Sequence, residues 1–177
     1  MNVLRGHPTK QRGAILVVSL ILLLIMTILA VTISQTSRMQ EMMTGNARDA
    51  DLSFQSAEAG LRNSEDYLAG LTASPVSCSS DPCKVFQENV LPADLHAQSV
   101  SFWSAHATEY GAAGTQEIPG VTQDPQYIIE EAGFVPDSLT VGRGVPPGRT
   151  FYRNTAHSFG GTDTAQTVVQ STFTRRY

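Results

Sequence analysis

Two cysteines, Cys78 and Cys83, are the residues of this chain whose types and spacing most directly suggest chemistry. Four residues separate them, within the segment "TASPVSCSSDPC" of residues 72–83. In an oxidising compartment, cysteines this close in the sequence are expected to form a small disulfide loop. The alternative is half of a zinc site, which would need two more ligands at a suitable spacing. Three histidines are the candidates, and none has that spacing: His96, His106 and His157. The pattern favours the disulfide, and we expect no metal site.

Catalytic motifs are not found elsewhere in the sequence. It contains no HExxH, no GxSxG and no P-loop. The segment "GRGVPPG" of residues 142–148 has prolines that forbid a helix start, so it is not expected to cradle a phosphate. Asp49 and Asp51 are two residues apart on a predicted helix and face different ways. Glu130 and Glu131 alternate across a predicted strand. With the histidines expected at the surface or in loops, we predict no catalytic residue, no cofactor and no enzyme.

A long uncharged run lies near the N-terminus. The 20 residues from Ala14 to Ile33 include 14 that are Leu, Ile or Val. As a helix rising ~1.5 Å per residue they span about 30 Å, the thickness of a bilayer core. Each Leu, Ile or Val contributes roughly −0.3 to −0.6 kcal/mol to insertion at a helix centre. The run is therefore expected to insert in a membrane.

The flank before this run is basic. Arg5, Lys10 and Arg12 precede it, and no acidic residue occurs before Glu41. This asymmetry predicts a single-pass protein whose N-terminus stays in the cytoplasm and whose C-terminus lies on the other side of the membrane. A secretory signal has a shorter apolar stretch and a small-residue cleavage site after it. Here the following segment, "AVTISQTS", offers only a poor site, so a retained helix is favoured.

Helical periodicity continues beyond the uncharged run. Apolar and small residues recur at steps of three and four: Met39, Met43, Ala47, Ala50, Phe54, Ala57, Leu61, Ser64, Leu68 and Leu71. No proline occurs between Ala14 and Leu71, so one continuous helix is expected. Residues 14–34 would be its membrane and polymerisation half, and residues 35–71 its amphipathic half. Glu58, beside the apolar stripe, is expected to be solvated or to pair with another subunit.

The start of this helix resembles that of a known protein class. "QRGAILVVSLILLLIMTILA" resembles the start of a type IV prepilin or pseudopilin, and "MTGNARDADLSFQSAEAGLR" is similar to the PilX family of minor pilins. "DPQYIIEEAG" and "YRNTAHSFGGTDTAQTVVQSTF" resemble that family more loosely. The resemblance implies that residues 1–13 are a leader peptide. A prepilin peptidase would cut between Gly13 and Ala14 and methylate the new amine of Ala14.

One residue departs from the pattern of most pilins. They have a glutamate at the fifth position after the cut, where this chain has Val18. A carboxylate in an apolar span costs ~3 kcal/mol, so it is kept where it has a partner, here the terminal amine of the neighbouring subunit. A subunit at the tip has no neighbour above it, and the tip pseudopilin of type II secretion also lacks this glutamate. The resemblance thus implies a place in the tip or priming complex.

Residues 72–177 are expected to form one periplasmic domain together with the amphipathic helix. The full chain has a net charge of −4, and removal of residues 1–13 would leave nine cations against 16 anions, a net charge of −7. This acidity argues against nucleic-acid binding. The arginines of this part are expected at solvated strand or loop ends: Arg143, Arg149, Arg153, Arg175 and Arg176.

The C-terminal part of the sequence reads as strands. "QYIIEE" (residues 126–131) is one, and residues 149–177 read as two more joined by a turn at Gly160–Gly161. Alternate residues of the last strand would rest on the long helix: Ala165, Thr167, Val169, Ser171 and Phe173. Residues 92–111 could hold a short helix, with Phe102 and Trp103 packed under a loop. The expected fold is α+β, the type IV pilin fold, with a long helix on an antiparallel sheet of three or more strands.

The function that these patterns and the resemblance imply is structural. We expect a minor pilin that primes or caps a type IV pilus and supports adhesion and twitching motility. Its implied partners are the membrane, the prepilin peptidase, other minor pilins, the major pilin and a PilY-type tip adhesin. One alternative is a pseudopilin of a type II secretion or competence system. Another is an anchored periplasmic enzyme or binding protein, which would keep Met1 and Arg12 in the mature chain.

Overall fold

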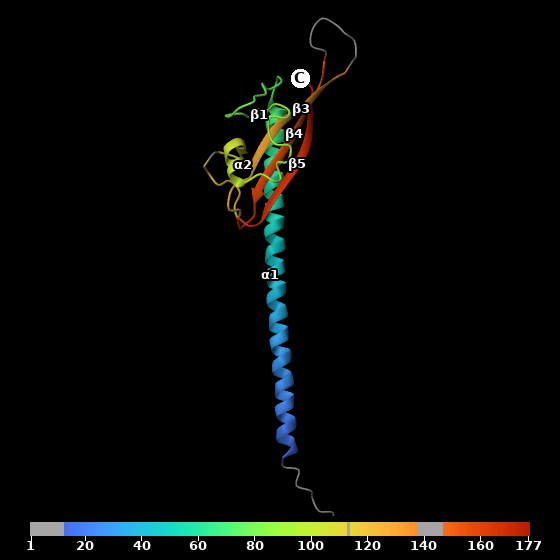
Figure 1. Ribbon diagram of the computed structural model, residues 1–177, viewed down its shortest axis with the longest axis vertical. Helices are drawn as coiled ribbons and strands as arrows, with labels where there is room; N and C mark the ends of the chain where they lie inside the picture. The colour runs from blue at the N-terminus through green and yellow to red at the C-terminus, as the bar shows by residue number, and fades with distance from the viewer. Residues whose placement is uncertain (1–12, 113, 138–146) are drawn as a thin grey trace, which may run out of the picture. The chain divides into compact units, whose positions relative to one another are not determined.

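Residues 13–112, 114–137 and 147–177 are described by the structure, a computed structural model. Its elements are, in chain order, α1 (Ala14–Gly70), β1 (Val85–Phe86), α2 (Val100–His106), β2 (Thr108–Glu109), β3 (Gln126–Pro136), β4 (Gly148–Phe159) and β5 (Gln166–Arg175) (Figure 1). Internal contacts divide the chain within α1, into a unit that ends at Gly45 and a unit over Asn46–Tyr177. The expected α+β class, with a long apolar helix and a sheet, is confirmed.

Helix α1 is 57 residues long and stops one residue short of the predicted Leu71. It is unbroken because no proline interrupts its main-chain hydrogen bonds. Hydroxyl groups within its apolar part donate to carbonyl oxygens of the preceding turn, as Thr27 does to Leu24 (2.8 Å). These donors are therefore satisfied inside the helix. All residues from 13 to 48 are exposed in the structure of the isolated chain.

The C-terminal end of α1 is capped by an arginine. The guanidinium of Arg175 on β5 donates to the carbonyl oxygens of Leu68 (2.7 Å) and Leu71 (2.5 Å). The last carbonyls of a helix have no partner within it, and a cation there also interacts favourably with the helix dipole. The expectation that Arg175 lies at a solvated strand end is wrong, because its side chain turns back to the helix.

The sheet is mixed, where we expected an antiparallel one. Strands β3, β4 and β5 are antiparallel in that order, and β2 pairs antiparallel to β3. Strand β1, however, is parallel to β3, with Val85 opposite Ile129. Parallel neighbours need a long crossover connection, and residues 87–125, which include α2, provide it. Pairing across such a distance leaves no local signal in the sequence.

The strands predicted in the C-terminal half are present. Strand β3 continues past the predicted residues 126–131 to Pro136, with a register shift between Glu131 and Gly133. Gly133 has a backbone φ of 136°, a value that residues with a Cβ rarely adopt. Glycine at this position therefore allows the strand to continue through the irregularity. Strands β4 and β5 flank the predicted turn at Gly160–Gly161.

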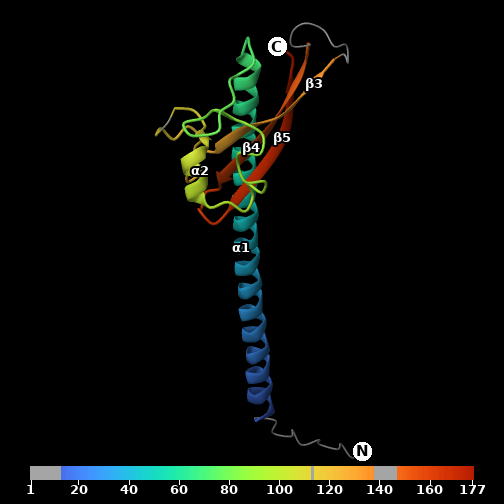
Figure 2. The ribbon, with the colours of Figure 1, turned by 45° about the horizontal axis from the view of Figure 1, so that its top comes forward.

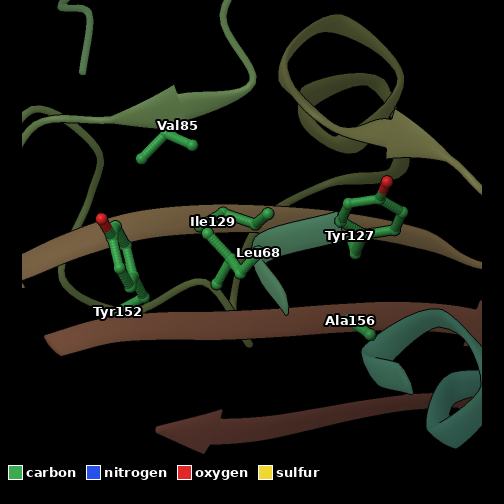
Figure 3. Close-up of a cluster of buried hydrophobic side chains, with 6 residues drawn as sticks. All are labelled: Leu68, Val85, Tyr127, Ile129, Tyr152 and Ala156. Carbon is green, nitrogen blue, oxygen red and sulfur yellow. The ribbon is translucent and has the colours of Figure 1, made fainter. Parts of the chain in front are cut away.

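One face of the sheet packs on residues 46–70 of α1. Its cluster of buried side chains is shown in Figure 3: Leu68, Val85, Tyr127, Ile129, Tyr152 and Ala156. Most other buried residues of α1 are small: Ser53, Ser56, Ala57, Gly60 and Ser64. A Cβ on Gly60 would lie 3.1 Å from the Cβ of Pro125 and 3.4 Å from that of Ala156. Small side chains therefore allow this close approach of helix and sheet.

The opposite face of the sheet is covered by α2 and the segment before it (Figures 1 and 2). A second buried cluster lies there: Phe86, Leu91, Leu95, Trp103 and Ile128. Side chains alternate along a strand, so Tyr127 and Ile129 face α1 whereas Ile128 faces α2. The short helix expected within residues 92–111 is thus present, and its Trp103 is fully buried on the sheet.

His157 contradicts the expectation that the histidines lie at the surface or in loops. It is 3% exposed, and its ring stacks on that of Trp103 at 5.1 Å between centroids. Its Nε2 lies 3.3 Å from Oε1 of Gln166. Burial lowers the pKa of the imidazole, and the contact with Gln166 opposes this effect. Its position on β4 places the side chain against Trp103 of the second cluster, and no local sequence pattern indicates this burial.

Candidate functional site

The apolar helix begins at the predicted processing site. Gly13 lies in a turn directly before α1, Ala14 is the first helical residue, and both are exposed. A Cβ on Gly13 would meet no atom of the described chain within 4 Å. The described part of the chain therefore gives no packing reason for a glycine at this position. The predicted leader itself, residues 1–12, lies outside the described residues.

The first turns of α1 present an uncharged apolar surface. Val18 is 59% exposed, and one turn away on the same side lie Ala14, Ile15 and Leu22. From Gly13 to Gln40 the only charged side chain is that of Arg38. α1 is the one helix in the described part of the chain that is long and apolar enough to span a membrane. This segment offers apolar contacts and no carboxylate that could pair with an amine.

Asp49 joins α1 to the connection between β4 and β5. Its carboxylate accepts hydrogen bonds from the main-chain N–H of Thr162 (3.2 Å) and from the Thr162 hydroxyl. The hydroxyl bond of Thr162 has the largest effect and holds the pKa of Asp49 below its usual value. Burial opposes this effect, and the main-chain bonds of Thr162 and Gly161 add to it. A Cβ on Gly160 would clash with the Asp49 side chain. Sequence reasoning missed this contact, because the partners are 113 residues apart.

Hydroxyl groups extend this connection along α1. The hydroxyls of Ser53 and Thr167 lie 2.5 Å apart, and Ser158 donates to the carbonyl of Ser53 (2.6 Å). Further along, Ser171 donates to the carboxylate of Glu65 (2.7 Å). Thr167 and Ser171 belong to the set of β5 residues expected on the helix. The sequence pattern thus correctly indicated which side of β5 faces α1.

The predicted disulfide is present between Cys78 and Cys83, whose Cα atoms are 6.0 Å apart. The main chain of Cys78 bonds to β1 and its neighbour through Val85 (3.0 Å) and Gln87 (3.0 Å). Among the described residues, no group of three or more histidine, cysteine, aspartate or glutamate side chains could hold a metal. The disulfide loop therefore supports the edge strand β1.

A histidine contact ties this loop to α2. The Nδ1 atom of His106 lies 2.5 Å from a carboxylate oxygen of Asp81, and the two side chains are 30% and 37% exposed. Since α2 packs on the sheet through Trp103, the contact connects the disulfide loop to the second cluster. His96, by contrast, is exposed, as expected.

The other arginines described within residues 72–177 are paired and form no free basic patch there. Arg153 lies 3.7 Å from Glu130, whose carboxyl is nearly buried; burial raises its pKa, and Arg153 opposes this. Arg149 (3.9 Å) and Arg176 both pair with Asp137. Arg153 was expected at a solvated end and is instead two-thirds covered. Arg143 lies outside the described residues.

Other predicted carboxylates do not come together. Asp51 accepts a hydrogen bond from Gln55 (2.8 Å) on its own helix. Glu58 is partly exposed and pairs with Arg62 at 3.5 Å, again within α1. These contacts are of the ordinary kind between residues four apart on a helix surface.

These features define a class of protein: a pilin-like subunit with an apolar N-terminal helix that fits a single membrane span and a helix-packed sheet bearing a disulfide loop. Comparison with family profiles is more specific. Residues 12–62 match the family described as PilX N-terminal, and residues 46–175 match the one described as type IV pilus assembly protein PilX C-term. The chain belongs to the PilX family of type IV pilus assembly proteins, as the resemblance implied.

This family consists of structural pilus components, so the chain is a subunit of the type IV pilus assembly machinery. The second match begins at residue 46, where the second compact unit also begins. Searches of curated proteins and of solved structures found no match.

Proposed function

We propose that this subunit is a minor pilin of the complex that primes or caps the pilus, located at the tip and not in the shaft. The observation that carries the proposal is the apolar surface around Val18, where most pilins have a glutamate. A subunit in the shaft uses that glutamate to pair with the terminal amine of a neighbour. A subunit without it can begin or end a fibre but lacks this contact for insertion within one.

The proposed maturation begins with cleavage between Gly13 and Ala14 by a prepilin peptidase, followed by methylation of the Ala14 amine. The exposed position of this bond before α1 supports the proposal. Residues 14–34 then hold the subunit in the inner membrane, with residues 35–71 and the domain of residues 72–177 in the periplasm. Extraction into a helical bundle replaces lipid contacts with similar apolar ones, so it is near balance and needs work from outside.

The proposed partners follow from this place in the fibre. They are the other minor pilins and the major pilin, which contact the apolar helix, and a PilY-type adhesin at the tip. Through them the subunit supports adhesion and twitching motility at the cell surface. The net charge of −7 expected for the mature chain supports protein partners over nucleic acid.

Quantitative mass spectrometry of sheared pili tests the position. We expect this subunit at a small fraction of the abundance of the major pilin, and loss of most surface pili when its gene is deleted. An abundance equal to that of the major pilin would contradict the proposal. Restoration of surface pili by the deleted gene, but not by a gene for a secretion pseudopilin, would distinguish a pilus subunit from a pseudopilin of a secretion system.

Sequencing of the mature N-terminus tests the maturation step. The expected terminus is N-methylated Ala14, and Gly13→Leu should leave the leader attached and stop assembly. The conservative variant Gly13→Ala serves as the matched control and should be processed at least in part. Normal pili in the Gly13→Leu strain would refute the route.

A further inference from the structure

Strand β5 forms an open edge of the sheet (Figures 1 and 2). In the described part of the chain its one strand neighbour is β4, paired without a register shift from Thr150 opposite Arg175 to Phe159 opposite Gln166. The other edge of the sheet is formed by β1 and β2, which have two residues each. Short strands are one of the devices by which proteins protect a sheet edge from further pairing.

Strand β5 is ten residues long and, before Arg175 at its end, has none of the devices that protect sheet edges. Residues 166–174, "QTVVQSTFT", contain no charge, no proline and no glycine. They are rich in β-branched side chains, and no bulge interrupts their pairing with β4. A long, regular and uncharged edge is a template for pairing with another strand.

The hydrogen bond from the N–H of Gly160 to the carbonyl of Ala165 (2.8 Å) fixes which main-chain groups are free. In an antiparallel pair, residues directed at the partner alternate with residues directed away. Counting from this bond, the odd-numbered residues of β5 bond to β4. The main-chain groups of the even-numbered residues point to the open edge: Gln166, Val168, Gln170, Thr172 and Thr174.

The surroundings of this edge differ on its two sides. On the α1 side lie the partly buried Val169 and Phe173. Glu65 accepts a hydrogen bond from β5, so the flank of α1 that carries it also faces this strand. Leu61 and Phe54, four and eleven residues earlier, share that flank, and Phe54 is 45% exposed. On the other side, Gln170 lies opposite Thr155 and Thr172 lies opposite Arg153 of β4. The charge of Arg153 is paired with Glu130, and Val168 packs on the second cluster.

From these observations we infer that the open edge of β5 binds an extended segment of a different protein, which adds a strand to the sheet. The main-chain groups supply the affinity, and alternating side chains supply the selectivity. The segment would place apolar residues beside Phe173 and Phe54, and uncharged polar residues beside Gln170 and Thr172. This inference does not depend on the proposed place in the fibre.

A second copy of this chain fits the edge poorly. The contacts Ser53 with Thr167 and Glu65 with Ser171 show that β5 and residues 46–70 of α1 run in the same direction. Antiparallel pairing of two β5 strands would make residues 46–70 of α1 run in opposite directions in the two copies. Two copies held in one membrane by the segments before residue 46, as proposed above, are not expected to pair in this way. In a parallel pair, a residue whose main-chain groups point to the partner strand lies opposite one whose groups point away, so two β5 strands would be shifted by an odd number of residues. A two-fold axis relating two identical parallel strands allows no such shift, so a closed dimer cannot form in this way.

Amide exchange of the full chain in detergent micelles, resolved by NMR, tests whether the edge accepts a strand. The probe is a synthetic peptide with seven alternating valines and threonines between lysine pairs. We expect exchange at Gln166, Val168, Gln170 and Thr172 to slow at least about tenfold, with little change at Thr167 and Val169. The same peptide with alternate amides N-methylated should have no effect. No slowing, or equal slowing at both sets, would overturn the inference.

Two edge variants and a matched control sharpen this test. Gln170→Pro removes an outward N–H without removing a bond to β4, and Thr172→Lys adds a charge at an exposed edge position. Both should abolish protection by the peptide, whereas Gln170→Thr should keep it. The lysine variant decides the outcome if the proline variant fails to fold. Unchanged protection in Thr172→Lys would contradict strand addition.

Photo-crosslinking in living cells tests the native occupant. A photoreactive residue in place of Gln170 should crosslink to another protein, at an extended segment with alternating apolar and polar residues. The product should disappear when Thr172→Lys is added. A crosslink to a second copy of this chain, or no crosslink at all, would refute the inference whether or not the subunit lies at the pilus tip.

Discussion

Asp49 shows how one side chain can join segments that are distant in the sequence. Its carboxylate holds Thr162, and the glycine at position 160 leaves room for the carboxylate to approach. The contact lies in the first turn of the part of α1 that belongs to the second unit, Asn46–Tyr177. It therefore fixes where the sheet begins to follow the helix.

Gly160→Ala is expected to destabilise the second unit. The added Cβ would clash with the carboxylate and the main-chain carbonyl of Asp49, so helix and turn must separate. Overpacking of this kind costs about 1–3 kcal/mol in the free energy of unfolding. Chemical denaturation of the full chain in detergent measures it.

The matched control is Gly45→Ala, where a Cβ would meet nothing within 4 Å. Alanine is favoured over glycine in a helix by up to about 1 kcal/mol, so this variant should be neutral or stabilising. Adding Asp49→Ala to Gly160→Ala should restore part of the loss. If Gly160→Ala is as stable as the unaltered chain, the close approach does not exist.

His157 is expected to make stability depend on pH on the acid side of neutrality. Burial lowers the pKa of the folded state below the ordinary value of 6.5, so the unfolded chain binds a proton more readily. This contribution to stability is fully present above about pH 6.5 and is lost as the pH falls through the folded-state pKa. Thermal unfolding should show a Tm that declines from pH 7.5 to pH 5.

In His157→Phe this decline should be smaller, because the aromatic ring can still stack on Trp103 but cannot be protonated. His96→Phe is the control, since His96 is exposed and should leave the decline unchanged. The difference between the two variants separates the histidine from the carboxyl groups. If the Tm of both variants declines equally as the pH falls, protonation of His157 does not contribute to the pH dependence of stability.

Among the elements, β1 depends most on a covalent bond. It has only two residues, and its neighbour Cys78 is held by the disulfide to Cys83. The double variant Cys78→Ser, Cys83→Ser should lose about 2 kcal/mol, the loop-entropy estimate for so short a loop. Denaturation with and without reductant measures this loss.

The reductant supplies the control for this variant. It should lower the stability of the unaltered chain by a similar amount and leave the double serine variant unchanged. Amide exchange should become faster at Val85 and Phe86, while β4 and β5 keep their protection. A loss spread evenly over all strands would mean that the loop supports the whole sheet and not its edge.

How far the sequence predicts each element depends on the distance over which its contacts act. The extent of α1 follows from local properties to within one residue, because a helical period without proline favours one unbroken helix. The side of β5 that faces the helix follows from alternation, and the disulfide follows from spacing. The parallel pairing of β1, the burial of His157 and the contact of Asp49 with Thr162 depend on partners far away in the sequence. No local pattern encodes them.

At the scale of the whole molecule, the two units make different demands on the sequence. The unit of residues 46–177 needs packing partners within the chain, and it has two buried clusters. Residues 14–33 need an apolar environment that the chain does not provide, because all of them are exposed. A charge placed in that segment should therefore affect insertion and assembly without affecting the fold of the domain.

Leu24→Arg tests this separation. An arginine near the centre of a membrane helix costs about 2.5–3.5 kcal/mol and the lost leucine adds roughly 0.3–0.6 kcal/mol, so membrane insertion should fall markedly. Fractionation should show less protein in the membrane, and electron microscopy should show few pili. Leu24→Ile, which keeps the apolar character, should behave as the unaltered chain.

Because the buried clusters lie within residues 46–177, Leu24→Arg protein recovered in detergent should keep its denaturation midpoint. A lowered midpoint would show that the two units are energetically coupled through α1, and normal piliation would show that residues 14–33 are not the assembly segment.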